Sequence, residues 1–309
     1  MRLLVFFGVY EAEASFAHVC LDQILDILRD HTVHLVIQDD ASPSRLGDRL
    51  ATGVRARLGD RVRVVRIERS LGFHGFYERR LSMLDQATQW GETFDYVVQL
   101  DPDLHFCSRK LAEVLQSPRL PELGIVGPAV QMRKRDYLLF LADFLPAGFR
   151  RRHKGDLLEH PWEPRRMCRV WWHDIGWQAL RGGFRGRIVT GALQVLSWKS
   201  VLAMRDRGWL SRRRRPVGLI YQDDVLIASF LAALGHPLRD LQEVVPTWKA
   251  EMFLAATTTA EEIRRRGFDL IHALKNDAWA HALREQLPLP PVRRDAEEGG
   301  VFRPRPNGA

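Results

Sequence analysis

The feature that most constrains the fold is a regular alternation of short apolar runs and amphipathic segments over the first hundred residues. The apolar runs lack helical periodicity, which is typical of buried strands, whereas the segments between them carry apolar residues at helical spacing. We expect strands at 3–9, 33–37, 62–67 and 94–100, and helices at 16–28, 46–58 and within 72–90. This alternation predicts an α/β fold in which helices flank a mostly parallel sheet.

Composition divides the chain into four stretches. Residues 1–131 hold the regular alternation, and residues 132–187 follow with poor periodicity, 13 basic residues and four of the nine tryptophans. Residues 188–287 return to regular patterns, with a strand at 188–197 and helices at 199–207, 225–234 and 261–266. Residues 288–309 are rich in proline, glycine and charge, which is typical of a disordered tail. We interpret 1–131 and 188–287 as halves of one domain, and 132–187 as an insertion or substrate-facing segment.

Composition also excludes several classes of protein. With 46% hydrophobic and 27% charged residues, the chain is of the globular kind. No run approaches the ~20 apolar residues that a membrane-spanning helix needs. The apolar start at 1–7 is too short for a signal peptide, because two glutamates follow closely. Three widely spaced cysteines favour a reducing, cytoplasmic compartment over a disulfide scaffold.

The net charge of +8 is unevenly distributed. Residues 1–131 carry 15 basic and 18 acidic residues, whereas residues 132–309 carry 31 basic and 20 acidic ones. Only six of the basic residues are lysine, a bias that GC-rich coding can produce, but such a bias would act evenly along the chain. The asymmetry therefore predicts that the second half faces an anion, such as a phosphate, an acidic polymer or a membrane surface.

Pairs of carboxylates follow two of the expected strands. Asp101 and Asp103 flank a proline directly after the fourth strand, where both can reach one Mg²⁺ or Mn²⁺ ion. Asp39 and Asp40 follow the second strand and could accept hydrogen bonds from a base or a ribose. The alternatives are ordinary ones, since Asp-Pro turns and aspartate helix caps are common. Ligands bind beyond the carboxyl ends of parallel strands, so we expect both pairs at one site.

Three further elements carry candidate chemistry. Asp223 and Asp224 open an apolar helix, where one can cap the helix and the other act as a general base. His272 could fold back to a metal with Lys275 near a phosphate, or the two could simply lie on a helix surface. The loop 70–75, which contains Gly72, precedes a helix whose N-terminus suits an anion, or it is a plain connection.

Taken in order, these elements resemble family 2-type glycosyltransferases with the GT-A fold. The segment Val36-Ile-Gln-Asp-Asp-Ala-Ser42 is similar to that family's nucleotide-contacting element, and Tyr96-Val-Val-Gln-Leu-Asp-Pro-Asp103 is similar to its D-x-D metal motif. Arg69–Phe76 resembles its glycine loop, Thr190–Gln194 its acceptor-side strand, and Tyr221–Gly235 its E-D segment. The match spans about 1–240. The first strand departs from the family pattern, and residues 132–187 have no counterpart in it.

The resemblance implies roles for individual residues. Asp39 or Asp40 would bind the base or ribose, with Gly72 in the nucleotide loop. Asp101 and Asp103 would serve the ribose and the metal–diphosphate, with Asp103 the firmer ligand of Mn²⁺ or Mg²⁺. His272 would be a third metal ligand, and Lys275 would assist the diphosphate. Asp224 would be the catalytic base, with Asp223 beside it in place of the family's glutamate.

The function expected from the resemblance is transfer of a sugar from a nucleotide-diphosphate sugar to an acceptor hydroxyl, with inversion, in polysaccharide or glycoconjugate biosynthesis. The acceptor would be a glycan, a lipid-linked molecule or another anionic molecule. A peripheral contact with a membrane is a further expectation. Nucleic acid is not an expected partner, because the sequence contains no recognised nucleic-acid-binding module. Two alternatives remain: a nucleotidyltransferase or pyrophosphorylase, and a non-catalytic carbohydrate-binding protein on the same scaffold. The first would need a basic, glycine-rich loop after the first strand, where the sequence is acidic.

Overall fold

The computed structural model describes residues 1–68, 76–142, 170–210, 223–252, 254–255, 257–272, 274–275 and 278–291. Several features singled out from the sequence lie outside these ranges. They are Gly72 and its loop, residues 143–169 of the basic segment and the tail beyond residue 291. The side chain of Asp223 is also outside the description, although the backbone of this residue begins a helix.

A seven-stranded sheet with the order β10-β6-β9-β4-β1-β2-β3 forms the centre of the fold. Its strands are β1 (Arg2–Val9), β2 (Thr32–Asp40), β3 (Val62–Ile67), β4 (Tyr96–Leu100), β6 (Ile125–Gly127), β9 (Leu193–Ser197) and β10 (Leu238–Asp240). β9 runs antiparallel to both of its neighbours, and every other pair is parallel. The predicted α/β class with a mostly parallel sheet is therefore confirmed.

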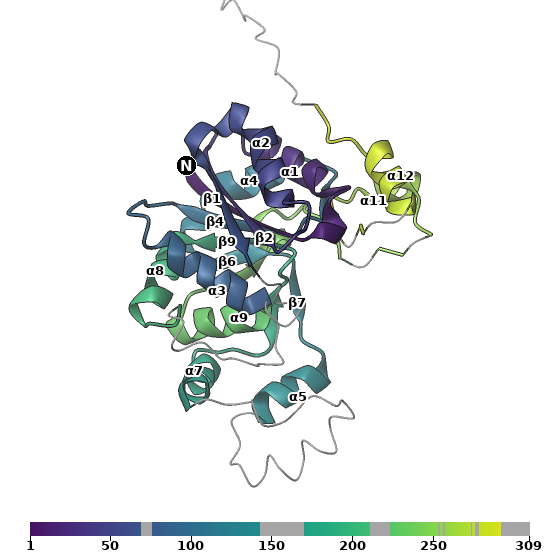
Figure 1. The fold of residues 1–309 in the computed structure, drawn as a ribbon. Coiled ribbons are helices and arrows are strands. Elements are labelled where there is room, and N and C mark those ends of the chain that lie inside the picture. Colours follow the sequence, from purple (N-terminus) through teal and green to yellow (C-terminus); the bar gives the residue numbers. More distant parts are fainter. Residues whose placement is uncertain are drawn as a thin grey trace, which may run out of the picture.

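Helices cover both faces of this sheet (Figure 1). One face packs against α1 (Ala17–Ile27), α2 (Leu46–Leu58), α4 (Leu111–Gln116) and α10 (Leu241–Val244), which share one apolar cluster. The other face packs against α3 (Phe76–Ala87), α7 (Val170–Arg181), α8 (Trp198–Asp206) and α9 (Asp223–Leu234). Successive strand side chains point to opposite faces, so Val5 lies in the first cluster and Leu4 and Phe6 lie in the second.

The bounds of most elements follow the sequence pattern, but one strand was wrong. The stretch 188–197 contains two strands, β8 (Arg187–Val189) and β9, because the chain turns at residues 190–192 and changes sheets. β8 pairs antiparallel with β7 (Ala129–Gln131) in a separate ribbon. The Trp-rich segment expected to be irregular also contains the regular helix α7, and α5 (Lys134–Ala142) precedes it.

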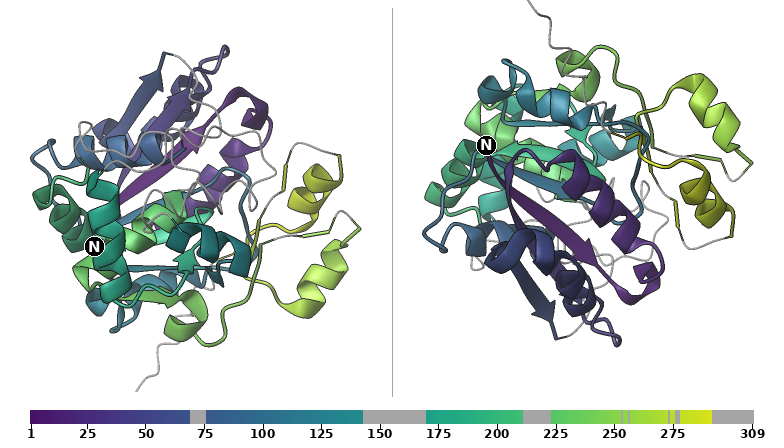
Figure 2. Two further views of the ribbon diagram at one scale, coloured as in Figure 1. Left: turned by 90° about the horizontal axis from the view of Figure 1, so that it is seen from below. Right: turned by 90° about the horizontal axis from the view of Figure 1, so that it is seen from above.

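A small C-terminal unit lies to one side of the main sheet (Figure 2). It comprises a three-stranded sheet, β11 (Ala250–Glu251), β12 (Leu270–Ile271) and β5 (His105–Phe106), together with α11 (Ala260–Arg266) and α12 (Ala278–Gln286). β12 pairs antiparallel with β5, which follows β4 after only four residues. This pairing brings the chain near residue 272 to the carboxyl end of β4.

The remaining elements are short 3₁₀ turns at Glu11–Glu13, Gly59–Arg61 and Leu120–Glu122. Within the part of the chain that the structure describes, no helix combines the length and hydropathy that crossing a membrane requires.

Candidate active site

The carboxyl ends of β1, β2 and β4 lie at one edge of the sheet. The register places Val9 of β1 opposite Asp39 of β2, and Phe7 of β1 opposite Leu100 of β4. Asp101 follows Leu100 directly, and its backbone N–H donates to the carbonyl of Ala192 at 2.9 Å. Topology therefore gathers the side chains that follow these strands, as the sequence predicts for a parallel sheet.

Asp101, Asp103 and His272 form a cluster at this edge. Each offers one ligand atom, and the three atoms lie within 4.8 Å of one another. The His272 Nε2 atom lies 3.2 Å from Asp103 Oδ1 and 3.8 Å from Asp101 Oδ2. The two segments are also joined through the backbone, because the N–H of Leu274 donates to the carbonyl of Asp103 at 3.1 Å. His272 follows β12 and does not lie on a helix surface. The alternative prediction of a histidine on a helix surface is therefore wrong.

The electrostatics of His272 reflect its carboxylate neighbours. Burial alone would lower the pKa of its imidazole, but the hydrogen bond to Asp103 and the charges of Asp103 and Asp101 outweigh burial and raise the pKa. Its Nδ1 atom lies 3.3 Å from the carbonyl of Met252. With Nδ1–H donating to that carbonyl, Nε2 faces the two carboxylates, which is the usual arrangement of a metal-binding histidine and its outer partner.

The donor set of this cluster fits a divalent cation. Two carboxylates and one imidazole give two oxygen ligands and one nitrogen ligand, and the half-exposed Asp101 leaves one side of the cluster open to further ligands. Two neighbouring carboxylates are costly to hold together without a positive partner. Asp101, Asp103 and His272 would hold the ion, and their role as ligands stays a prediction.

The two aspartates that end β2 have different partners. Asp39 is almost fully buried and accepts hydrogen bonds from the N–H and hydroxyl of Ser42, both at 2.7 Å, and from the N–H of Gly47 at 2.9 Å. These bonds hold the turn that leads into α2. Asp40 instead forms a buried ion pair with Arg79 of α3, with 2.6 Å between Oδ2 and Nη1. Asp39 therefore has a clear structural role, and Asp40 is the one tied to side chains around the site.

A small cavity of about 50 Å³ adjoins Asp101 on the α3 face of the sheet. Its floor is β1 at Gly8, where an added Cβ would meet no atom within 4 Å. The polar side chains that line it are Tyr10, Glu13, Gln38, Arg79, Arg80, Gln99 and Asp101. The opening over Gly8 thus adjoins the cluster of Asp101, Asp103 and His272, and amides and guanidinium groups line it.

Glu13 is the most perturbed acid near the site. It is 5% exposed, and its carboxylate accepts a hydrogen bond from the N–H of Tyr10 at 3.0 Å. Burial raises the pKa of Glu13 to about 9, and the charges of Asp103 and Asp101 act in the same direction. In the metal-free protein Glu13 is therefore a neutral acid at pH 7, able to donate a hydrogen bond into the cavity.

Three glutamines interrupt the apolar strands next to this cavity. Gln38 of β2, Gln99 of β4 and Gln194 of β9 are all buried, and Gln99 and Gln194 are partners in the register of β4 and β9. Gln194 receives a hydrogen bond from the Arg80 guanidinium and donates one to the carbonyl of Val189 at 2.8 Å. Arg80 is thereby fixed over the strands, and its guanidinium lines the cavity.

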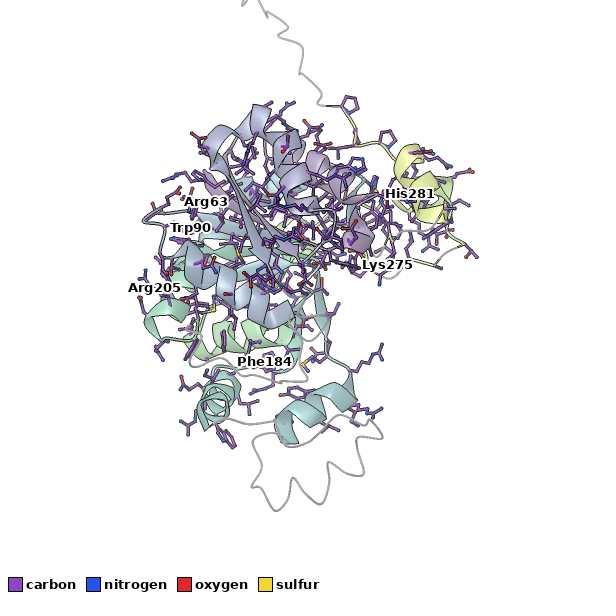
Figure 3. All side chains as sticks on the ribbon, in the orientation of Figure 1. Arg63, Trp90, Phe184, Arg205, Lys275 and His281 are labelled. Carbon is purple, nitrogen blue, oxygen red and sulfur yellow. The ribbon has the colours of Figure 1, made fainter. Side chains whose placement is uncertain are left out.

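The other predicted site residues lie outside the cluster of Asp101, Asp103 and His272. Asp224 is buried near the start of α9, and its Oδ1 atom accepts a hydrogen bond from the N–H of Val225 at 2.7 Å. Lys275 is exposed and follows His272 by three residues, on the segment that leads to α12 (Figure 3). Gly72 and the Asp223 side chain lie outside the described residues. The structure thus brings the three metal candidates together.

Sequence reasoning missed Glu13, Arg79 and Arg80 as residues of this site. Glu13 was noted only as a charge that ends the first apolar run, and the arginines lay beside the core-facing leucines of α3. A usable signal did exist, because single amides such as Gln99 and Gln194 within apolar strands mark places where the sheet contacts something polar.

No protein-family model matches the chain, and no curated protein matches it. Several solved structures are similar, among them the galactosyltransferase LgtC in complex with donor and acceptor sugar analogues (TM-score 0.46, 15% identity, 92% of this chain and 95% of that one). Others are the mannosyltransferase PcManGT from Pyrobaculum calidifontis with GDP-Man and Mn²⁺ (0.44, 17%, 77% and 54%) and the bifunctional glycosyltransferase WbbM (0.48, 12%, 92% and 51%).

All three neighbours are glycosyltransferases, and this chain spans about half the length of the latter two. Membership of the family 2 glycosyltransferases stays a prediction from the sequence.

Proposed function

We propose that this protein is a metal-dependent glycosyltransferase that moves a sugar from a nucleotide-diphosphate sugar to an acceptor hydroxyl. The observation that carries the proposal is the cluster of Asp101, Asp103 and His272 at the carboxyl edge of the sheet. Residues about 170 positions apart in sequence form it through the pairing of β5 with β12. A divalent ion at this place would neutralise the diphosphate that leaves when the glycosidic bond breaks.

The donor set bears on the identity of the ion. Mg²⁺ is a hard cation that strongly prefers oxygen ligands, and an imidazole nitrogen suits it poorly. Since His272 supplies such a nitrogen, Mn²⁺ is the better fit of the two candidate ions. Lys275, exposed on the same segment, would approach the diphosphate from the C-terminal unit.

The cavity over Gly8 would receive part of the donor. It adjoins Asp101, so a donor whose diphosphate lies at the metal cluster can extend a hydroxyl-bearing group over β1. Gln38, Gln99 and the neutral Glu13 offer donors and acceptors for hydroxyl groups. Asp40 would act here through Arg79, which it holds at the wall of the cavity.

Asp224 would take the proton from the acceptor hydroxyl. It lies at the N-terminal end of α9, which packs against α3 on the same face of the sheet as the cavity. A carboxylate base opposite the leaving group gives single displacement with inversion, by the logic of inverting glycosidases. The acceptor would be a glycan or lipid-linked molecule that carries negative charge, in keeping with the positive second half of the chain.

The nucleotidyltransferase alternative gains no support from the loop after β1. This loop forms a 3₁₀ turn at Glu11–Glu13, and the acidic residue Glu13 lines the cavity where a basic phosphate loop would be needed.

The test is a donor screen that measures nucleoside diphosphate release from UDP-, GDP- and TDP-sugars with Mn²⁺. We expect the protein to turn over one class of donor, and we expect Asp103→Asn to abolish this turnover. The control is Asp60→Asn, which changes an exposed aspartate on the 3₁₀ turn at 59–61 and should leave turnover unchanged. Asp224→Asn should lower the rate ~10²–10⁴-fold and preserve donor binding. Proton NMR of the first product should show an inverted anomeric centre. No release from any donor, or full activity in Asp103→Asn, would contradict the proposal.

A further inference from the structure

The helices α5 and α7 form an end of the molecule with an unusual surface. Figure 1 shows them next to α9, on the far side of the main body from α11 and α12. Among the residues that the structure describes, four large apolar side chains are exposed, and two of these, Leu138 on α5 and Trp177 on α7, are each 45% exposed. This exposed leucine and tryptophan give the end of the molecule two large apolar side chains that can contact a partner other than water.

The two helices are connected through the residues that follow α7. Tyr137 of α5 stacks edge-on against Phe184, with 6.3 Å between ring centroids, and its hydroxyl donates to the carbonyl of Phe184 at 3.3 Å. Gln131 donates to the carbonyl of Arg185 at 2.6 Å. α7 itself packs on α9, where the close approach of Gly182 to the Ala232 carbonyl leaves no room for a side chain. The pair is therefore held to the body of the domain.

Cations lie close to the two exposed apolar side chains along the sequence. Arg133, Lys134 and Arg135 lie at the start of α5, and Arg181 and Arg185 lie at the end of α7 and just after it, all of them exposed. Among the described side chains, no carboxylate pairs with Arg133, Lys134, Arg181 or Arg185. Residues 132–142 and 170–187 together hold six basic and two acidic residues. We refer to Leu138, Trp177 and these five cations as the α5–α7 surface.

We propose that the α5–α7 surface binds the face of a lipid bilayer that contains anionic lipids. Tryptophan and leucine insert at the boundary between headgroups and acyl chains, while neighbouring arginine and lysine contact the lipid phosphates. An acidic glycan would explain the cations but not the exposed Leu138. A protein partner would explain the apolar pair, but an excess of six basic over two acidic residues in these two stretches fits a uniformly negative surface better. The proposal extends the proposed function by giving a location to the acceptor.

The experiment is flotation of the full-length protein with vesicles of phosphatidylcholine, with and without 30% phosphatidylglycerol, at 0.1 and 0.5 M NaCl. Three variants are compared with wild type. The apolar pair carries Leu138→Ser and Trp177→Ser, and the charge triple carries Arg133→Ser, Lys134→Ser and Arg181→Ser. The control replaces three exposed arginines elsewhere by serine, namely Arg49, Arg55 and Arg265. Each residue changed is exposed, so the fold should persist, and thermal unfolding checks this.

We expect wild type to bind the anionic vesicles, and less so in high salt, because screening weakens the attraction. The charge triple should bind about 100-fold more weakly, since each cation near an anionic surface contributes a factor of about five. The apolar pair should lose about tenfold or more, and the control should bind like wild type. The proposal is overturned if wild type does not bind, if the control loses as much as the charge triple, or if the apolar pair changes only self-association. Because no donor is present, this result is independent of whether the protein transfers a sugar.

Discussion

Replacement of Gly8 by valine separates the cavity's proposed role from the stability of the fold. Gly8 lies in β1, its backbone is not in the left-handed region, and an added Cβ would meet no atom within 4 Å. The strand should accept the side chain and gain about 0.5–1 kcal/mol, because glycine within a strand costs that much in backbone entropy. Three added carbon atoms would, however, occupy much of a cavity of about 50 Å³.

Two measurements on Gly8→Val test this reasoning. Urea unfolding should give an unchanged or slightly higher free energy of unfolding, and titration calorimetry should show donor affinity reduced at least tenfold while Mn²⁺ binding is retained. Gly53→Ala, another glycine with open space around it but on α2, should gain stability with unchanged donor affinity. The reasoning is refuted if Gly8→Val binds the donor within twofold of wild type, or if it fails to fold.

Three further predictions rest on charge and packing. The affinity for Mn²⁺ should rise with pH through and above pH 6.5, because His272 has a raised pKa and must lose its proton to bind metal. Titration calorimetry of His272→Ala should show weaker Mn²⁺ binding that no longer depends on pH in this way. In metal-free protein, the free energy of unfolding should fall as the pH rises from about 5 to 9. The pKa of Glu13 is about 9 in the folded protein and 4.5 in the unfolded chain, so its stabilising contribution is complete below pH 4.5 and is lost as the pH approaches 9. Glu13→Gln should flatten this slope in urea titrations. Gly182→Ala should lower the free energy of unfolding by about 1–3 kcal/mol, because its Cβ would lie 1.9 Å from the Ala232 carbonyl oxygen, and a melting temperature like that of wild type would contradict this.

The sheet could be predicted from the sequence because its signal is local. Each of β1, β2 and β3 is an apolar run with a helix-period segment after it, and β4 is an apolar run that follows the last of these segments. The bounds of α2 and β3 agree with the pattern residue for residue. The break between β8 and β9 was not predicted, because both pieces are apolar and only a tertiary choice of partner strand separates them. The helix α7 was hidden by tryptophans and glycines that obscure its periodicity.

The candidate site was predictable only where the residues follow a strand. Asp101 and Asp103 could be placed at the carboxyl edge from sequence order alone. The position of His272 could not be predicted, because it depends on the pairing of two-residue strands that lie far apart in sequence: Leu270 pairs with Phe106, 164 positions earlier. The same limit applies to Glu13, whose pKa depends on burial by elements that no local pattern describes.

Asp39 and Asp40 show how similar residues take different roles. They were interchangeable in the sequence, as either a nucleotide contact or a turn cap. The structure uses Asp39 as the turn residue, with three hydrogen bonds from Ser42 and Gly47, because its side chain points to the α2 face of the sheet. Asp40 points to the other face and pairs with Arg79.

The central claim is that Asp101, Asp103 and His272 hold a divalent ion that binds the diphosphate of a sugar donor. The most direct measurement is titration calorimetry of UDP, GDP and TDP into the full-length protein, with and without Mn²⁺, alongside Asp103→Asn. We predict that one nucleotide binds wild type only when Mn²⁺ is present, and that Asp103→Asn binds none. The account is contradicted if no nucleotide binds at millimolar concentration, or if binding is the same without Mn²⁺ and in Asp103→Asn.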